Sequence, residues 1–163
     1  MKINDKYALS VFKQELVSLK KGINSSRDPY HYFSLSTINN NAPQSRTIVL
    51  RNIKENPLKL SFNTDIRSNK IKELVSNSNC SALFYNNVRR VQLRLNCNAI
   101  LHSNNDTSLK VWKKTALQSR KCYMAPFSPS SSLKNWETNL PREYLACDPS
   151  QKNSQKGYDN FCC

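Results

Sequence analysis

The sequence predicts a mainly β fold with flanking helices, arranged as a small antiparallel barrel. Five strand-like segments follow one another with turn signals between them, and one short helix interrupts the series. One amphipathic helix precedes these segments and another follows them. A chain of 163 residues suits a single domain, 1–163, with a modest core.

The first predicted element is a helix over residues 5–21, DKYALSVFKQELVSLKK. Asp5 can cap its start and Gly22 can end it. Apolar residues recur at helical spacing and are expected to form one buried face. These residues are Leu9, Phe12, Leu16 and Leu19.

After Gly22 the hydrophobic pattern changes to alternation, which predicts barrel strands within residues 30–102. The turn NNNAPQ separates the first two strands, because Asn tolerates the left-handed conformation. The last strand alternates most cleanly, with Gln92 and Arg94 on its polar face. The predicted strands cover 31–39, 45–53, 58–63, 80–87 and 90–101.

Two further helices are predicted, one inside the strand series and one after it. The short helix covers residues 68–76. The second covers 106–119, with Asp106 as its cap and Leu109, Trp112 and Ala116 facing inward. Residues 131–163 are polar and weakly patterned, and their last residues, NFCC, resemble the start of a strand cut short.

Composition narrows the function classes. The net charge of +14 permits binding to nucleic acid or acidic membranes, but the cations are dispersed, which favours a solvated surface. No signal-peptide or membrane-spanning pattern is visible, so a cytoplasmic protein without membrane partners is expected. Six cysteines without CxxC spacing, and only two histidines, predict no metal site. Two glycines are too few for a Gly-rich phosphate loop.

The segment LSFNTDIRSNKIKELV, residues 60–75, places Arg67, Lys70 and Lys72 where a helix begins. Cations are unfavourable at the positive end of the helix dipole, whereas an anion bound there is stabilised. Thr64 and Ser68 add hydroxyl donors beside the free N–H groups of the helix start. The segment therefore predicts an anion site, and the alternative is that the lysines are ordinary solvated residues.

Two other segments, SRTIVLR and RRVQLRL, extend this motif. Together the three resemble the FMN-binding split-barrel family of pyridoxamine 5'-phosphate oxidase, over roughly residues 8–130. The TDIRSNK form is similar to the family's less characterised FMN-binding relatives. The resemblance implies an antiparallel Greek-key split β-barrel, here without its last strands. The matching positions are Arg46 to Arg51, then Phe62, Thr64, Ser68 and Lys70, then Gln92.

The resemblance also implies FMN as cofactor, bound at the interface of a homodimer. Arg46 and Lys70 would hold the flavin phosphate together with Thr64, Arg67 and Ser68. Gln92 would form a hydrogen bond with the flavin ring. The edge of the ring would lie along Thr47, Ile48, Val49 and Leu50. Arg51 and Asn63 complete the predicted cofactor-binding set, and both depart from the oxidase pattern, which has a lysine and an aromatic residue there.

The implied function is FMN binding with flavin-dependent oxidoreductase activity, or a degenerate member of that class. No catalytic side chain or substrate is predicted, because the flavin would supply the redox chemistry. The oxidase's Arg-x-His substrate motif has no counterpart after residue 130, so a truncated, non-catalytic product is one alternative. The other is a basic barrel that binds nucleic acid. The polar face of residues 90–98 lacks the aromatic residues that such binding uses.

Overall fold

The computed structural model describes residues 5–163. They divide into two compact units. The first contains the chain up to Phe62 together with Asn79–Asn98, and the second contains Asn63–Ser78 together with Ala99–Cys163. Two compact units can belong to one domain or to two, so the single domain over 1–163 stays a prediction.

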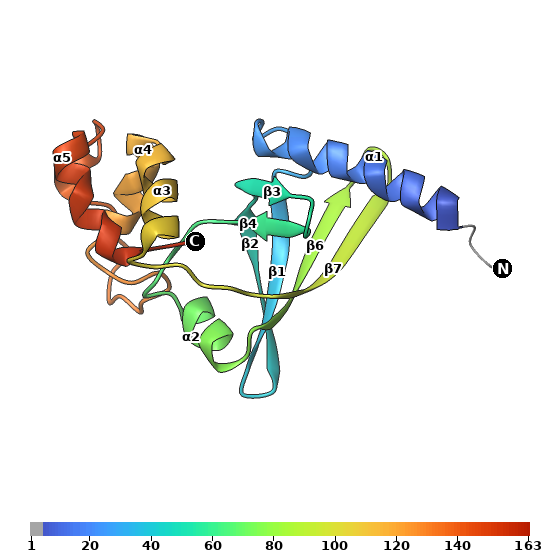
Figure 1. The fold of residues 1–163 in the computed structure, drawn as a ribbon. Helices are drawn as coiled ribbons and strands as arrows, with labels where there is room; N and C mark the ends of the chain where they lie inside the picture. Colours follow the sequence, from blue (N-terminus) through green and yellow to red (C-terminus); the bar gives the residue numbers. More distant parts are fainter. Residues whose placement is uncertain (1–4) are drawn as a thin grey trace. The chain divides into compact units, whose positions relative to one another are not determined.

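The first unit is built on a four-stranded antiparallel sheet with the strand order β2-β1-β6-β7 (Figure 1). A small hairpin, β3-β4, belongs to the same unit. The predicted mainly antiparallel β architecture with flanking helices is confirmed. The strands are β1 Tyr32–Asn39, β2 Ala42–Val49, β3 Asn52–Lys54, β4 Lys59–Ser61, β6 Asn79–Asn86 and β7 Val91–Asn98.

The two faces of this sheet differ in burial, as the alternating sequence pattern predicts. One face carries the core side chains Phe33, Leu35, Ile48, Ala82 and Phe84. In β7, Leu93 and Leu95 pack against that core, while the alternate residues of the strand, from Gln92 to Asn98, are exposed. The opposite face of the sheet exposes several large side chains, namely Tyr32, Ile38, Leu83 and Tyr85.

The turn between β1 and β2 has the predicted backbone conformation. Asn40 and Asn41 have φ values of 46° and 65°, which lie in the left-handed region. Asn adopts this region more readily than most residues. The hairpin extends away from the end of the sheet where β1 begins (Figure 1).

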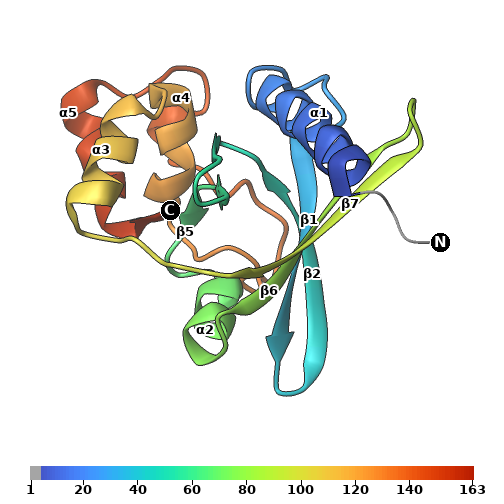
Figure 2. The same cartoon turned by 45° about the vertical axis from the view of Figure 1, so that its right-hand side comes forward.

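Helix α1, Asp5–Ile23, lies across the end of the sheet opposite the Asn40–Asn41 turn (Figures 1 and 2). Leu16 and Leu19 are buried in the core, as predicted. Leu9 and Phe12 are 53% and 41% exposed, so their predicted burial is wrong. The reason is that only the C-terminal half of the helix packs against the core. The capping side chain of Asp5 lies outside the part described.

Gly22 does not end α1, which continues to Ile23. Its role is close packing instead. A Cβ atom at this position would lie 2.7 Å from the carbonyl carbon of Tyr30. The Gly22 carbonyl also lies 2.7 Å from Nδ1 of His31. Glycine is therefore required by the close approach of the Tyr30 backbone rather than by a turn.

The second unit combines short helices with the strand pair β5-β8. Trp112, Tyr123 and Phe161 form its aromatic core, and the centroids of the Tyr123 and Phe161 rings are 5.0 Å apart. The strand predicted at the end of the chain is present as β8, which pairs with the strand that leads toward α2. The elements are β5 Thr64–Asp65, α2 Asn69–Ser76, α3 Asp106–Lys114, α4 Leu117–Arg120, η1 Lys121–Met124, η2 Arg142–Tyr144, α5 Gln151–Ser154, η3 Gln155–Asn160 and β8 Phe161–Cys162.

The predicted continuous helix over 106–119 is wrong, because α3 ends at Lys114 and α4 starts at Leu117. The guanidinium of buried Arg120 donates hydrogen bonds to the carbonyls of Trp112, Lys113 and Thr115. The N–H of Thr115 also donates to the Trp112 carbonyl, so the Arg120 bonds add to the hydrogen bonding at the end of α3. Ala116, predicted to face inward, is consequently exposed.

The start of α3 also differs from the prediction. Asn105, and not Asp106, is its cap, and the Asn105 side chain accepts a hydrogen bond from the backbone N–H of Ser108.

Over residues 5–163, the helices are too short or too polar to cross a membrane.

Candidate functional site

The turn into α2 brings together two hydroxyl groups and one ammonium group. Lys70 Nζ donates to Thr64 Oγ1 at 3.0 Å. Thr64 Oγ1 lies 3.4 Å from Ser68 Oγ, and both residues are buried. We refer to Thr64, Ser68 and Lys70 as the α2 N-terminal site. The structure thus brings together three of the residues that the sequence motif singled out.

The backbone of α2 adds to the positive character of this site. The helix is Asn69–Ser76, in agreement with the predicted 68–76, and Ser68 occupies the cap position. The Ser68 hydroxyl donates to the carbonyl of Asp65 at 2.7 Å instead of capping the helix. The first turn carries no acidic residue to offset the helix dipole. An anion would therefore be stabilised there by both the dipole and Lys70.

Arg67 has a contact that the sequence motif did not reveal. Its guanidinium pairs with the buried carboxylate of Asp65, with an Nη2–Oδ2 distance of 2.7 Å. The hydrogen bonds to Asp65 raise the pKa of Arg67 above its ordinary value. Nη1 of Arg67 also donates to the carbonyl of Ala125 at 3.0 Å. Part of the charge predicted to face an anion is thus neutralised by a neighbouring acid.

Asn63 directly precedes this site and contains an unsatisfied polar atom. Its Oδ1 is buried and accepts no hydrogen bond from the residues that the structure describes. Buried acceptors in native proteins usually have a hydrogen-bond donor, so this unsatisfied acceptor needs an explanation. A bound ligand with a hydroxyl or N–H donor would provide one.

Arg46 lies on the core face of the sheet in the first unit, because it is paired with buried Leu35. Its Nη1 donates to the hydroxyl of Thr37 and to the carbonyl of Leu35. Gln92 lies on the other face, paired with exposed Tyr85. Within one chain, Arg46 and Gln92 therefore point to opposite sides of the same sheet.

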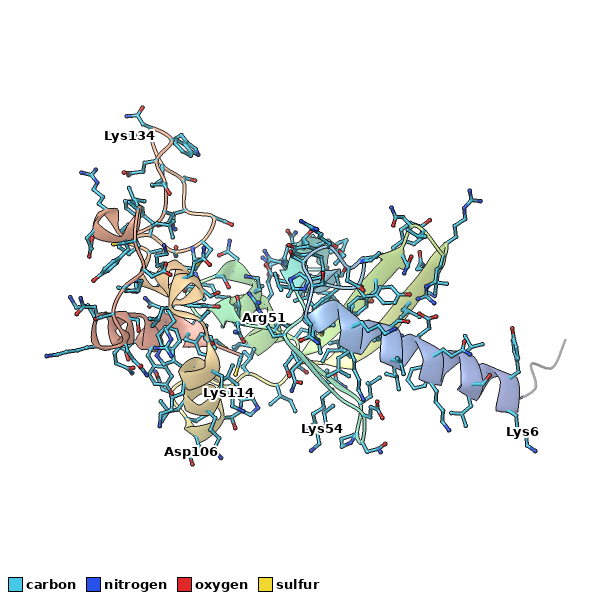
Figure 3. All side chains as sticks on the ribbon, turned by 90° about the horizontal axis from the view of Figure 1, so that it is seen from above. Lys6, Arg51, Lys54, Asp106, Lys114 and Lys134 are labelled. Carbon is cyan, nitrogen blue, oxygen red and sulfur yellow. The ribbon has the colours of Figure 1, made fainter. Side chains whose placement is uncertain are left out.

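The residues predicted to line the flavin ring follow Arg46 along β2. Ile48 and Leu50 are buried in the core, so their side chains are not exposed to a ligand. The Leu50 N–H already donates to the carbonyl of His31 at 2.8 Å. Thr47 is exposed and Val49 is half-buried. Arg51 is exposed and lies between β2 and β3, and Figure 3 labels its side chain.

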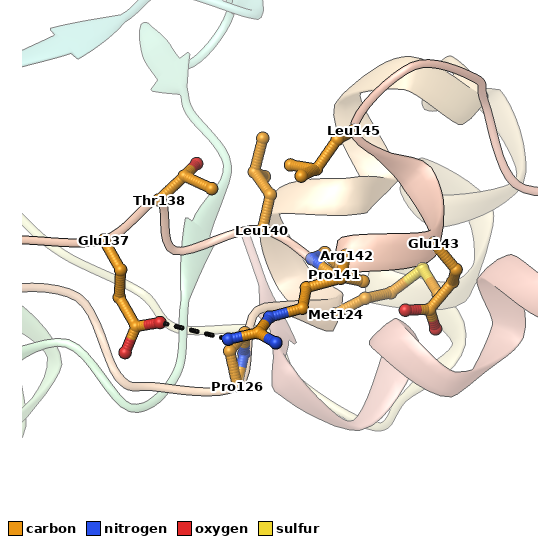
Figure 4. Close-up of a pocket in the computed structure, with 9 residues that line it drawn as sticks. All are labelled: Met124, Pro126, Glu137, Thr138, Leu140, Pro141, Arg142, Glu143 and Leu145. Atoms are coloured by element: carbon orange, nitrogen blue, oxygen red, sulfur yellow. Dashed lines mark ion pairs between the residues drawn. The ribbon is translucent and has the colours of Figure 1, made fainter.

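A separate cavity of about 610 Å³ lies in the second unit (Figure 4). Glu137 and Arg142 form an ion pair at its edge, with an N–O distance of 3.9 Å. Its lining residues include none of the predicted cofactor-binding residues, and 91% of the Arg142 side chain is exposed. The cavity is lined by Met124, Pro126, Glu137, Thr138, Leu140, Pro141, Arg142, Glu143 and Leu145.

Two solved structures share the fold. One is a pyridoxamine 5'-phosphate oxidase-related, FMN binding protein from Nostoc punctiforme, with a TM-score of 0.70 and 22% identity over 93% of this chain and 77% of that one. The other is PhzG from Burkholderia lata in complex with tetrahydrophenazine-1-carboxylic acid. Its TM-score is 0.65, with 18% identity over 95% of this chain and 73% of that one. Neither the fold nor these similarities support the nucleic-acid alternative.

Sequence similarity is higher to a plant protein. The chain is 33% identical over 135 residues to pyridoxine/pyridoxamine 5'-phosphate oxidase 2 of Arabidopsis thaliana. The aligned region covers 78% of this chain and 66% of the relative, slightly less than two thirds of its length. The family described as pyridoxamine 5'-phosphate oxidase, FMN-binding domain, matches residues 11–103. This match includes the α2 N-terminal site and covers more than half of the sequence, so the chain belongs to the pyridoxamine 5'-phosphate oxidase FMN-binding domain family.

Proposed function

We propose that this protein binds FMN and that the flavin phosphate occupies the α2 N-terminal site. One observation supports this most directly. The Lys70 ammonium and the hydroxyls of Thr64 and Ser68 converge at a helix start that has no acidic residue. A phosphate dianion needs charge-assisted donors, which the Lys70 ammonium and the two hydroxyls can supply, and the positive end of the α2 dipole stabilises the charge further.

The groups beside the phosphate site also suit FMN. The ribityl chain that joins the phosphate to the flavin ring carries hydroxyl groups, which can donate hydrogen bonds. The buried Oδ1 of Asn63 is an acceptor in need of such a donor. We assign Asn63 to the ribityl chain and Lys70 to the phosphate.

Arg46 and Gln92 are proposed as further flavin contacts, from two copies of the chain. They lie on opposite faces of one sheet, so a single flavin is poorly placed to reach both in the same copy. The exposed sheet face that carries Gln92 also presents Leu83 and Tyr85, which are 36% and 55% exposed. Exposed apolar groups of this kind are suited to an interface with a second copy. These features support a homodimer with a flavin at the interface.

The proposed activity is that of a flavin-dependent oxidoreductase. Bound FMN supplies the electron-transfer chemistry, whereas the protein holds the phosphate, orients the ring and limits water around it. The name of the Arabidopsis relative suggests a pyridoxine or pyridoxamine 5'-phosphate as substrate. We propose this substrate class for the present chain on that similarity.

Flavin fluorescence during titration with the protein tests the proposal. FMN, FAD and riboflavin are compared, since they share the ring but differ in the phosphate. FMN should bind most tightly, because only FMN carries a terminal phosphate dianion. Equal affinities for FMN and riboflavin would show that the α2 N-terminal site holds no phosphate.

A further inference from the structure

We propose that Asp65 and Arg67 form a positioning pair for the phosphate site, and that Arg67 does not itself contact the flavin phosphate. This inference rests on the proposed function. It assigns to Arg67 a different role from the one implied by the sequence motif.

The contacts of Arg67 show where its hydrogen-bonding capacity is used. The Asp65 carboxylate accepts from the backbone N–H of Arg67 at 2.8 Å, from Nε at 3.0 Å and from Nη2 at 2.7 Å. Nη1 donates to the carbonyl of Ala125 at 3.0 Å. The side chain of Asp65 is 5% exposed and that of Arg67 is 27% exposed. A buried bidentate pair of this kind fixes the orientation of the guanidinium.

The charge balance also argues against Arg67 as a phosphate ligand. Asp65 and Arg67 together carry no net charge, so a nearby anion is attracted mainly by Lys70 and the helix dipole. Turning Arg67 toward a phosphate would leave the Asp65 carboxylate buried without its partner. Removing one partner of a buried ion pair is strongly unfavourable.

The pair is located where it can set the spacing of the phosphate-binding groups. The carbonyl of Asp65 accepts from both the hydroxyl and the backbone N–H of Ser68. Thr64, the preceding residue, pairs with Cys162 of β8. Arg67 then ties this turn to Ala125, the residue after η1. Asp65 and Arg67 thus hold Thr64 and Ser68 in place without being ligands themselves.

A further backbone hydrogen bond holds the same turn, and a second bond holds the residue that accepts it. The Ile66 N–H donates to the carbonyl of Asn160 at 2.8 Å. The side chain of Asn160 donates to the carbonyl of Tyr123 at 2.8 Å. The turn therefore has backbone support that does not depend on Arg67. We expect an Arg67 variant to fold, with a less precise phosphate site.

A double-mutant cycle tests the inference. Asp65→Asn, Arg67→Gln and the double variant are titrated with FMN and with riboflavin, and their thermal unfolding is measured. Each single variant should weaken FMN about tenfold, and the double variant should weaken it by a similar factor, because both changes break the same contact. Riboflavin affinity should change by less than about twofold, since riboflavin lacks the phosphate.

Lys72→Gln is the matched control, because it removes one positive charge from the exposed side of α2 without touching Asp65. It should leave the ratio of FMN to riboflavin affinity unchanged. Asp65→Asn is the milder of the two single changes, since Asn keeps the shape and an acceptor oxygen, and the Arg67 side chain is 27% exposed and can be hydrated. It keeps the test valid should Arg67→Gln, which leaves the buried Asp65 carboxylate without its partner, fail to fold.

Three results would overturn the inference. If Arg67→Gln weakens FMN while Asp65→Asn leaves it unchanged or tighter, Arg67 is a direct phosphate ligand. If the variants weaken FMN and riboflavin equally, the pair has only a structural role. If Arg67→Gln does not change FMN affinity, Arg67 has no role in the phosphate site. Failure of the wild-type protein to prefer FMN over riboflavin is a different outcome, which overturns the proposed function itself.

Discussion

Each compact unit contains a buried carboxylate that pairs with an arginine, and the chemistry of these two buried pairs is nearly the same. In the first unit Arg89 donates to both oxygens of Glu15 at 2.8 Å. In the second unit Arg67 donates to both oxygens of Asp65. Each carboxylate is almost completely buried, with 6% and 5% of the side chain exposed. What differs is the separation of the partners along the chain.

Glu15 and Arg89 are 74 positions apart, whereas Asp65 and Arg67 are two apart. The Glu15–Arg89 pair joins α1 to the turn between β6 and β7, and the Tyr30 hydroxyl donates to the same carboxylate at 2.8 Å. Hydrogen bonds from Arg89 lower the pKa of Glu15. A long-range pair connects elements that separate on unfolding, so it contributes to the stability of the fold. A local pair mainly restricts the shape of one turn, so it affects the groups that the turn carries.

The largest expected effect is on stability, at Glu15. Glu15→Ala leaves the Tyr30 hydroxyl and the Arg89 guanidinium without their acceptor. Because Arg89 is partly exposed and can be rehydrated, we expect a loss of about 2–3 kcal/mol, below the upper range for buried pairs. Urea unfolding followed by tryptophan fluorescence measures it.

A matched control is available on the surface of the same helix. Lys20 pairs with Glu55, and both side chains are substantially exposed. Glu55→Ala should cost less than about 1 kcal/mol. Equal losses for the Glu15 and Glu55 variants would contradict a stabilising role of the buried pair. A changed ratio of FMN to riboflavin affinity in Glu15→Ala would show that the two kinds of pair are not distinct in function.

The next effect concerns ligand affinity, at Lys70. Lys70→Ala removes the ammonium that donates to Thr64 Oγ1 in the proposed phosphate site. We expect FMN binding to weaken by about 1.5–3 kcal/mol, as for a lost hydrogen bond to a charged group. Riboflavin binding and urea stability should change little. Lys72→Ala is the control, and the residue assignment is wrong if it weakens FMN as much as Lys70→Ala does.

Alkaline pH should weaken the stabilising contribution of the Glu15–Arg89 pair, because the Tyr30 hydroxyl donates to Glu15. Burial, followed by the hydrogen bond to Glu15, raises the pKa of Tyr30 to about 12. A group whose pKa is raised on folding contributes stability below its unfolded pKa, about 10, and loses that contribution as the pH rises toward 12. Wild-type stability should therefore fall by about 1 kcal/mol more than that of Tyr30→Phe between pH 9 and 11. Parallel pH dependence of the two proteins would contradict this.

The strands and the site motif could be predicted because their signals are local. Alternation along residues 91–98 identifies β7 and the exposure of Gln92. The Asn-rich turn predicts the left-handed residues Asn40 and Asn41. Thr64, Ser68 and Lys70 lie in one short segment, so a helix start is enough to bring them together.

The contacts that hold these elements could not be predicted, because they join distant parts of the chain. Nothing near Arg67 indicates that its guanidinium reaches the carbonyl of Ala125, 58 positions away. The break after Lys114 has a similar cause, since no glycine or proline marks it. It depends on Arg120, whose side chain turns back to the carbonyls of α3. Sequence spacing locates helices and strands, but long-range hydrogen bonds decide where some of them end.

The smallest expected effect concerns Asn63, whose buried Oδ1 has no donor among residues 5–163. In the proposed complex a ribityl hydroxyl donates to it. Asn63→Ala should therefore weaken FMN and riboflavin equally, by about 0.5–1 kcal/mol, the contribution of one neutral hydrogen bond. The stability of the ligand-free protein should be unchanged or slightly higher, because the substitution removes an unsatisfied acceptor.

Asn63→Asp is the control, since it keeps the shape and the acceptor but adds a negative charge close to the phosphate. It should therefore weaken FMN more than riboflavin. A loss confined to FMN in Asn63→Ala would place this residue at the phosphate, and a loss of stability without a change in affinity would remove it from the site.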